Sequence, residues 1–134
     1  MATISPVWAH VPQPEYLQET VLGAGTGIQI ESRVQFVTVT WSDIDGGDTA
    51  TAAPAGWLVD KSVQISGTTV TSVALQGSND NLEYYTLNDP QGNALSGISA
   101  EKIEQILENT LYIKPVVTTG TDVDIIVFGR LPTE

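Results

Sequence analysis

The feature that most constrains this chain is a two-residue alternation of apolar and polar side chains, in short segments separated by turn residues. Segments with this period and many β-branched or aromatic residues are typical of strands that bury one face. The expected strands cover residues 34–41, 60–66, 70–76, 82–87, 111–117 and 123–131. Short strands at near-regular spacing predict an all-β fold, a single β-sandwich of jelly-roll or immunoglobulin-like type.

Turn chemistry sets the expected limits of these strands. Gly67-Thr68 is expected to turn the chain between two strands, and strong turn clusters follow at 77–81 and 88–93. Pro115 would place its strand at an edge or a bulge, because proline donates no hydrogen bond. The one helical candidate is residues 99–107, a short helix that Ser99 would cap, with an apolar face formed by Ile103, Ile106 and Leu107.

The first 32 residues differ from the rest of the chain in their proline and glycine content. Three prolines and the run GAGTG at 23–27 favour an extended, loosened backbone. We therefore expect two parts, an extended N-terminal arm and linker over 1–32 and a β-sandwich domain over 33–134. The expected contact residues of the arm, toward another subunit or a larger surface, are its apolar anchors Trp8, Val11, Tyr16 and Leu17.

Composition narrows the function. A chain of 134 residues with 41% hydrophobic residues is long enough for one core, and without cysteine that core must be held by packing. The net charge of −11 argues against binding to nucleic acid or to an anionic membrane, since both kinds of binding require positively charged side chains on the protein. We also expect no secretory signal and no membrane-spanning helix, because no stretch approaches roughly 18 apolar residues. A protein made in the cytoplasm is expected.

Three motifs suggest chemistry but fit a plainer interpretation better. Asp43, Asp45 and Asp48 could bind calcium, yet their spacing departs from the EF-hand pattern, and we expect them to cap a turn. The GAGTG run lacks the lysine and the following helix of a phosphate-binding loop. His10, the single histidine, lies between prolines, where nothing would orient it as a base. Sixteen acidic residues are enough to supply the carboxylate pair of a glycoside hydrolase, but most of them lie in expected turns and on the expected short helix, which favours a solvated face.

From these motifs we predict no catalytic residue, no metal and no cofactor.

The large aromatic residues allow two interpretations. Trp41 and either Tyr84 or Tyr85 are expected to close the core, whereas Trp57 follows a proline and glycine connection and could be exposed. An exposed set of such rings would form a platform for sugars. That alternative stays open beside the core interpretation.

Two resemblances follow from short segments. The turn GSND at 77–80, followed by an aromatic residue and leucine, resembles a strand-turn-strand pattern of discoidin-like carbohydrate- and lipid-binding sandwiches. A resemblance that covers more of the chain is to capsid decoration (cement) and related head proteins of tailed bacteriophages. It rests on VTVTW, KSVQISG, VALQGSND, TLNDPQGNAL and IEQILENTLYIKPVV, at 37–41, 61–67, 73–80, 86–95 and 103–117.

The phage resemblance implies a non-enzymatic virion protein on the outer capsid surface. Its implied partners are the major capsid protein and itself, as a homo-oligomer, with a trimer expected on symmetry grounds. The acidic charge agrees with a position away from the genome. The alternative is a discoidin-like glycan-binding module on the virion, in a head fibre or tail component.

Overall fold

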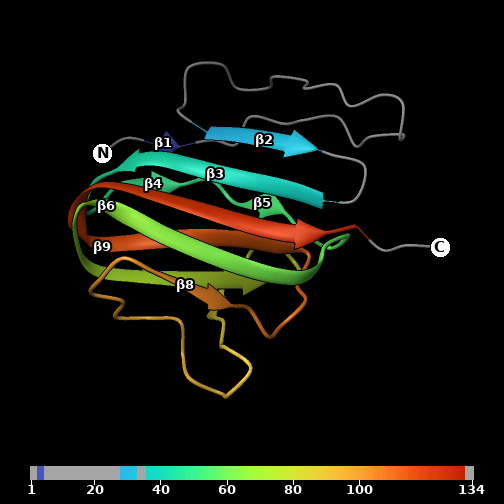
Figure 1. Cartoon of the computed structure of the whole chain (residues 1–134). Helices are drawn as coiled ribbons and strands as arrows, with labels where there is room; N and C mark the ends of the chain where they lie inside the picture. The colour runs from blue at the N-terminus through green and yellow to red at the C-terminus, as the bar shows by residue number, and fades with distance from the viewer. Residues whose placement is uncertain (1–2, 5–27, 33–35, 132–134) are drawn as a thin grey trace.

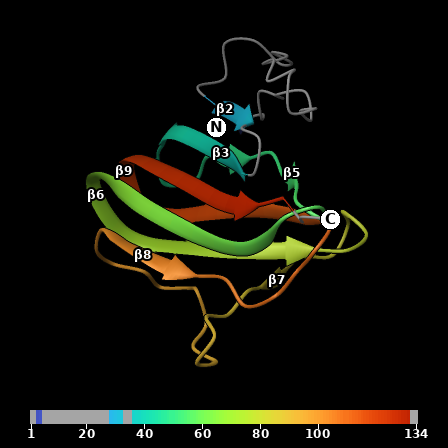
Figure 2. The ribbon, with the colours of Figure 1, turned by 45° about the vertical axis from the view of Figure 1, so that its right-hand side comes forward.

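The computed structural model describes residues 3–4, 28–32 and 36–131, and every regular element among them is a β-strand. The prediction of an all-β chain is confirmed for these residues. The strands are β1 (Thr3–Ile4), β2 (Ile28–Ser32), β3 (Phe36–Ile44), β4 (Thr49–Ala50), β5 (Ala53–Pro54), β6 (Val59–Ser78), β7 (Tyr85–Thr86), β8 (Lys102–Gln105) and β9 (Tyr112–Arg130). Seven form an antiparallel sheet in the order β2-β3-β9-β6-β7, with β5 beside β9 and β8 beside β6 (Figures 1 and 2). β1 and β4 pair in parallel and form a second sheet of two strands.

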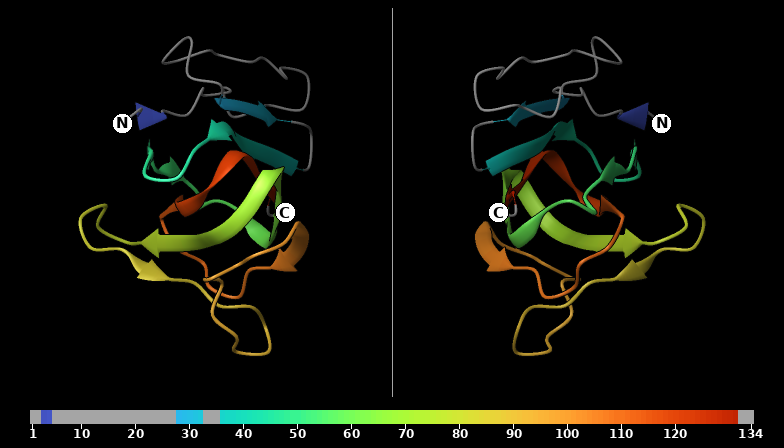
Figure 3. Two further views of the ribbon diagram at one scale, coloured as in Figure 1. Left: turned by 90° about the vertical axis from the view of Figure 1, so that its left-hand side faces the viewer. Right: turned by 90° about the vertical axis from the view of Figure 1, so that its right-hand side faces the viewer.

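The centre of the sheet is a ribbon of two long strands. β6 has 20 residues and β9 has 19, and they pair from Val59–Arg130 to Ser78–Tyr112. Near the middle the ribbon curves back on itself, so that its two halves face each other (Figures 1 and 3). Register shifts between Val70 and Val73 lie in the curved part, as expected where a bulge bends a strand.

The predicted turn at Gly67-Thr68 is therefore wrong, as is the break between the two strands predicted at 111–117 and 123–131. Each strand supplies the other's hydrogen-bond partners around the curve, so neither strand has to end there. A Cβ on Gly67 would lie 2.8 Å from the Asp122 carbonyl oxygen and 2.9 Å from the Val123 Cα. The glycine permits this close approach of two backbones within a continuous ribbon.

The core lies between the two halves of the ribbon and β3. Alternate residues of all three strands are buried, as the two-residue period predicts. Trp41 is fully buried, and its indole Nε1 donates a hydrogen bond to the Thr51 carbonyl oxygen at 2.9 Å. The buried aliphatic and indole side chains of the three strands are Val37, Val39, Trp41, Ile44, Val63, Ile65, Val73, Leu75, Ile113, Val117, Val123, Ile125 and Val127.

The predicted short helix over 99–107 is also wrong. Lys102–Gln105 forms β8, which pairs with Ser62–Ile65 of β6. A helix of this length has too few internal hydrogen bonds to offset its nucleation cost, whereas β6 offers a complete set of partners. Of the expected apolar face only Ile106 is buried, and Ile103 and Leu107 are exposed.

Part of the predicted arm joins the sheet. Ile28–Ser32 pairs with Val37–Trp41 of β3, and Thr3–Ile4 pairs with Thr49–Ala50. The boundary predicted at Ser32 therefore does not coincide with the edge of the sheet. Several residues of the sequence analysis lie outside the described residues. They are the four predicted contact residues Trp8, Val11, Tyr16 and Leu17, together with His10 and the GAGTG run. No helix of the described part is long and apolar enough to cross a membrane.

Candidate functional site

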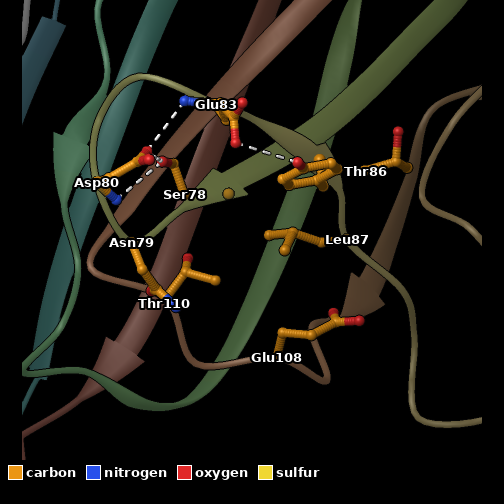
Figure 4. Close-up of a pocket in the computed structure, with 10 residues that line it drawn as sticks. Ser78, Asn79, Asp80, Glu83, Thr86, Leu87, Glu108 and Thr110 are labelled. Carbon is orange, nitrogen blue, oxygen red and sulfur yellow. Dashed lines mark hydrogen bonds between the residues drawn. The ribbon is translucent and has the colours of Figure 1, made fainter.

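A pocket of about 360 Å³ lies beside the C-terminal end of β6 (Figure 4). Three segments that are distant in the sequence form it: the end of β6 with its turn, β7, and the connection that leads into β9. Its lining residues are Gly77, Ser78, Asn79, Asp80, Glu83, Tyr85, Thr86, Leu87, Glu108 and Thr110.

The turn after β6 holds the first side of the pocket rigidly. Asp80 Oδ1 accepts hydrogen bonds from the Ser78 hydroxyl at 2.8 Å and from the backbone N–H groups of Leu82 and Glu83, both at 2.9 Å. The Ser78 hydroxyl oxygen in turn accepts one from the Asn81 N–H at 2.9 Å. The turn predicted at 77–81 is thus confirmed, and these donors, with the Glu83 and Leu82 amides foremost, lower the pKa of Asp80.

The opposite side carries Glu108. Its two carboxylate oxygens accept hydrogen bonds from the backbone N–H and the side-chain amide of Asn88, at 2.8 and 2.6 Å. Burial opposes the charge of Glu108, but these hydrogen bonds prevail and its pKa is lowered. With Asp80 and Glu83 the pocket presents three carboxylates, and no cationic side chain is among its lining residues. This arrangement suits a ligand that donates hydrogen bonds and carries no negative charge.

Three large apolar side chains in or next to the segments that form the pocket are exposed to solvent. Leu82 is 84% exposed, Tyr85 is 67% exposed and Leu111 is 51% exposed. The Leu111 N–H donates to Asn79 Oδ1 at 3.0 Å, which ties Leu111 to the same turn. We call these three residues the apolar rim.

The aromatic residues divide differently from the prediction. Trp41 is in the core as expected, but neither tyrosine is buried, so that part of the prediction is wrong. Both residues of β7, Tyr85 and Thr86, are exposed. Tyr84 instead donates its hydroxyl to Asn81 Oδ1 and lies 4.2 Å beneath the Lys114 Nζ, measured to the ring centre. Trp57 is partly buried against the core.

Of the three aspartates predicted to cap the turn of the acidic loop, Asp48 does so. Asp48 Oδ2 accepts a hydrogen bond from the Asp45 N–H at 2.9 Å, and Asp45 Oδ1 accepts one from the Asp122 N–H at 3.0 Å. The latter bond fastens the loop to the curved part of the ribbon. Among the described residues, no three His, Asp or Glu side chains are placed to hold a metal ion.

The sequence analysis identified the turn of this pocket but missed its far side. Glu108 and Thr110 lie about thirty residues beyond Ser78 in a region predicted to be partly helical, and no local pattern marks them as its neighbours. Only the pairing of β6 with β9 brings them together. Comparison with known proteins adds no further guide: no family model, curated protein or solved structure matches this chain.

Proposed function

We propose that this chain is a non-enzymatic structural protein of a tailed-phage virion, which binds the outer surface of the capsid and stabilises it. The observation that carries the proposal is the apolar rim, Leu82, Tyr85 and Leu111. Exposed aromatic and aliphatic side chains grouped in this way are typical of protein contacts, whereas single exposed ones are common on any surface. The resemblance of the segments at 37–117 to capsid decoration proteins gives the class of partner.

The proposal includes the finer fold and assembly. The two facing halves of the β6–β9 ribbon support a β-sandwich of jelly-roll or immunoglobulin-like type. The partners would be the major capsid protein and two further copies of this chain, in a trimer on a symmetry axis of the lattice. The net charge of −11 suits an outer position, because it would be repelled by the packaged genome.

The mechanism is bridging. A protein that binds only the assembled lattice stabilises it by its binding free energy, and contacts to several subunits at once resist their separation. The predicted arm residues Trp8, Val11, Tyr16 and Leu17 would add a second contact to that of the rim.

Co-sedimentation with capsids that lack the protein tests this. Wild-type protein should pellet with them, and Tyr85→Ala should reduce the affinity about tenfold or more if the ring is an anchor. Ile103→Ala is the matched control, because Ile103 is 64% exposed on β8, outside the rim. Trp8→Ala tests the arm without removing β1. Failure of the wild type to pellet would refute the proposal.

The pocket favours a second candidate, a glycan-binding module. Tyr85 offers a ring face for a sugar, and the Asp80 and Glu83 carboxylates offer acceptors for its hydroxyl groups. Binding of the wild type to a panel of neutral polysaccharides, lost in both Tyr85→Ala and Glu83→Gln, would support it. Loss of capsid binding in Tyr85→Ala but not in Glu83→Gln would favour the rim over the pocket.

A further inference from the structure

Lys61 is the most deeply buried charged side chain among the described residues. Only 1% of its surface is exposed, at the start of β6 where the chain enters from Leu58. Its Nζ donates to the Leu58 carbonyl oxygen at 3.4 Å and to the Asn109 Oδ1 at 2.5 Å. The neighbouring Leu58 and Ile106 are buried as well, and the Ile106 N–H donates to the Lys61 carbonyl oxygen at 3.0 Å. Neither role in the proposed function uses this lysine.

The contact with Asn109 joins two groups that can react. Since a carbonyl bond is about 1.23 Å long, the Lys61 Nζ lies at most about 3.7 Å from the Asn109 Cγ, near the range of a reactive approach. Lysine attacks carbonyl carbon only as the neutral amine. Burial lowers the pKa of Lys61, while the negative charges of Asp60 and Glu108 partly offset this, so the neutral form is more accessible than in water.

A proton carrier is also present. The Glu108 carboxylate precedes Asn109 in the chain and is close enough for its charge to act on Lys61, and that of Lys61 on it. Asn88 holds this carboxylate in place through two hydrogen bonds. A carboxylate whose charge acts on the amine is the class of group that transfers protons in general acid–base catalysis.

We infer that Lys61 and Asn109 form an intramolecular isopeptide bond, with Glu108 transferring the proton. The Lys61 Nζ attacks the Asn109 Cγ, and the new C–N bond forms as the bond from Cγ to Nδ2 breaks. Glu108 accepts a proton from the attacking amine and returns it to the departing nitrogen, which leaves as ammonia. No oxidant or further reactant is needed. Asn109 lies in an exposed loop, so the ammonia has a path to solvent.

The bond would fasten the start of β6 to the connection that leads into β9. These are two of the four ends at which the strands of the central ribbon join the rest of the chain. In a chain without cysteine it would supply the covalent closure that a disulfide gives elsewhere, by restricting the unfolded state. This inference does not depend on the identity of the partner in the proposed function.

Intact-mass spectrometry of the full chain tests the inference directly. Loss of one ammonia should make the folded wild-type protein about 17 Da lighter than its sequence, after any removal of the initiator methionine. Asn109→Ala and Lys61→Met should show their full masses, and Glu108→Gln should do so when freshly purified. Asn93→Ala, a substitution in another exposed loop, should keep the loss and serves as the matched control.

Peptide mapping separates this bond from a succinimide, which also loses ammonia. Trypsin should fail to cleave after Lys61, and a peptide carrying Lys61 linked to Asn109 should be found. The full sequence mass in wild-type protein after prolonged incubation would overturn the inference, as would a loss of ammonia that persists in Asn109→Ala. Should Lys61→Met not fold, the Asn109→Ala result still decides.

Discussion

The β6–β9 ribbon and the connection between its two strands, residues 79–111, differ in how many of their large apolar side chains are exposed to solvent. In the ribbon the large side chains on one face are almost fully buried, from Val63 to Val127. The connection is divided: four of its apolar side chains are buried and five are more than half exposed. The buried ones are Leu87, Leu95, Ile98 and Ile106, and the exposed ones are Leu82, Tyr85, Ile103, Leu107 and Leu111. Figure 3 shows the loops of the connection projecting from the body of the sheet. The difference indicates that the ribbon holds the fold together and leaves the connection free to contact other molecules.

The largest effect that would break this comparison concerns the core that β3 forms with the ribbon. Trp41→Ala should lower the free energy of unfolding by about 3–5 kcal/mol, because it leaves a cavity and removes the indole hydrogen bond to Thr51. Urea denaturation followed by circular dichroism measures this. A loss below 1 kcal/mol would mean that the core between β3 and the ribbon does not dominate stability.

The curve of the ribbon should show a smaller effect. Gly67→Ala places a methyl group against the Asp122 and Val123 backbones and should cost about 1–3 kcal/mol of unfolding free energy. Thr68→Ala, at the next and exposed position, is the control and should stay within about 0.5 kcal/mol. Equal effects of the two changes would refute the close approach of the strands.

Acid should act on the connection through Asp89. The carboxylate of this residue accepts hydrogen bonds from the Asn93 and Gln91 N–H groups, both at 2.9 Å, and they lower its pKa. A lowered folded-state pKa stabilises the fold above the unfolded value of about 4, and that stability is lost as the pH falls through the folded value. Thermal melts at pH 7 and pH 3 should show a smaller acid-induced drop for Asp89→Asn than for the wild type.

The smallest expected effect on stability concerns an exposed residue of the connection. Tyr85→Ala removes a side chain that is mostly in water, so the free energy of unfolding should change by about 0.5 kcal/mol or less. The same variant is expected to weaken capsid binding strongly. A destabilisation as large as that of Trp41→Ala would show that Tyr85 supports the fold and is not kept for contact.

The sequence predicted the ribbon better than the connection, for a physical reason. Alternation along Val63–Ile65 and Val123–Val127 reports directly which face is buried, and the structure agrees. The length of the strands was missed, because glycine between two strands usually marks a turn, whereas Gly67 here permits close packing. In the connection, Ile103, Ile106 and Leu107 fit a helical period, but the open edge of β6 draws Lys102–Gln105 into the sheet.

One side of the candidate site could be predicted from the sequence, and the other could not. Ser78 and Asp80 carry a recognisable turn pattern, and their hydrogen bonds follow it. Glu108 and Lys61 carry no such pattern, since their significance arises only from residues brought close by strand pairing. A buried lysine is also contrary to expectation for its residue type, so nothing in the sequence around Lys61 indicates its burial.

The pairing of β6 with β9 has a consequence for how the chain folds. The two strands meet first at Ser78–Tyr112, where the connection between them must close, and the pairs toward Val59–Arg130 span ever longer stretches of sequence. Closure of such long loops precedes the contacts that reward it, so folding should be slow for a chain of this size. The hydrogen bond from the Leu111 N–H to Asn79 Oδ1 lies beside that closing point. The turn at Ser78–Glu83 would then act as the nucleus from which the ribbon forms, and substitutions there would slow folding more than those near Arg130.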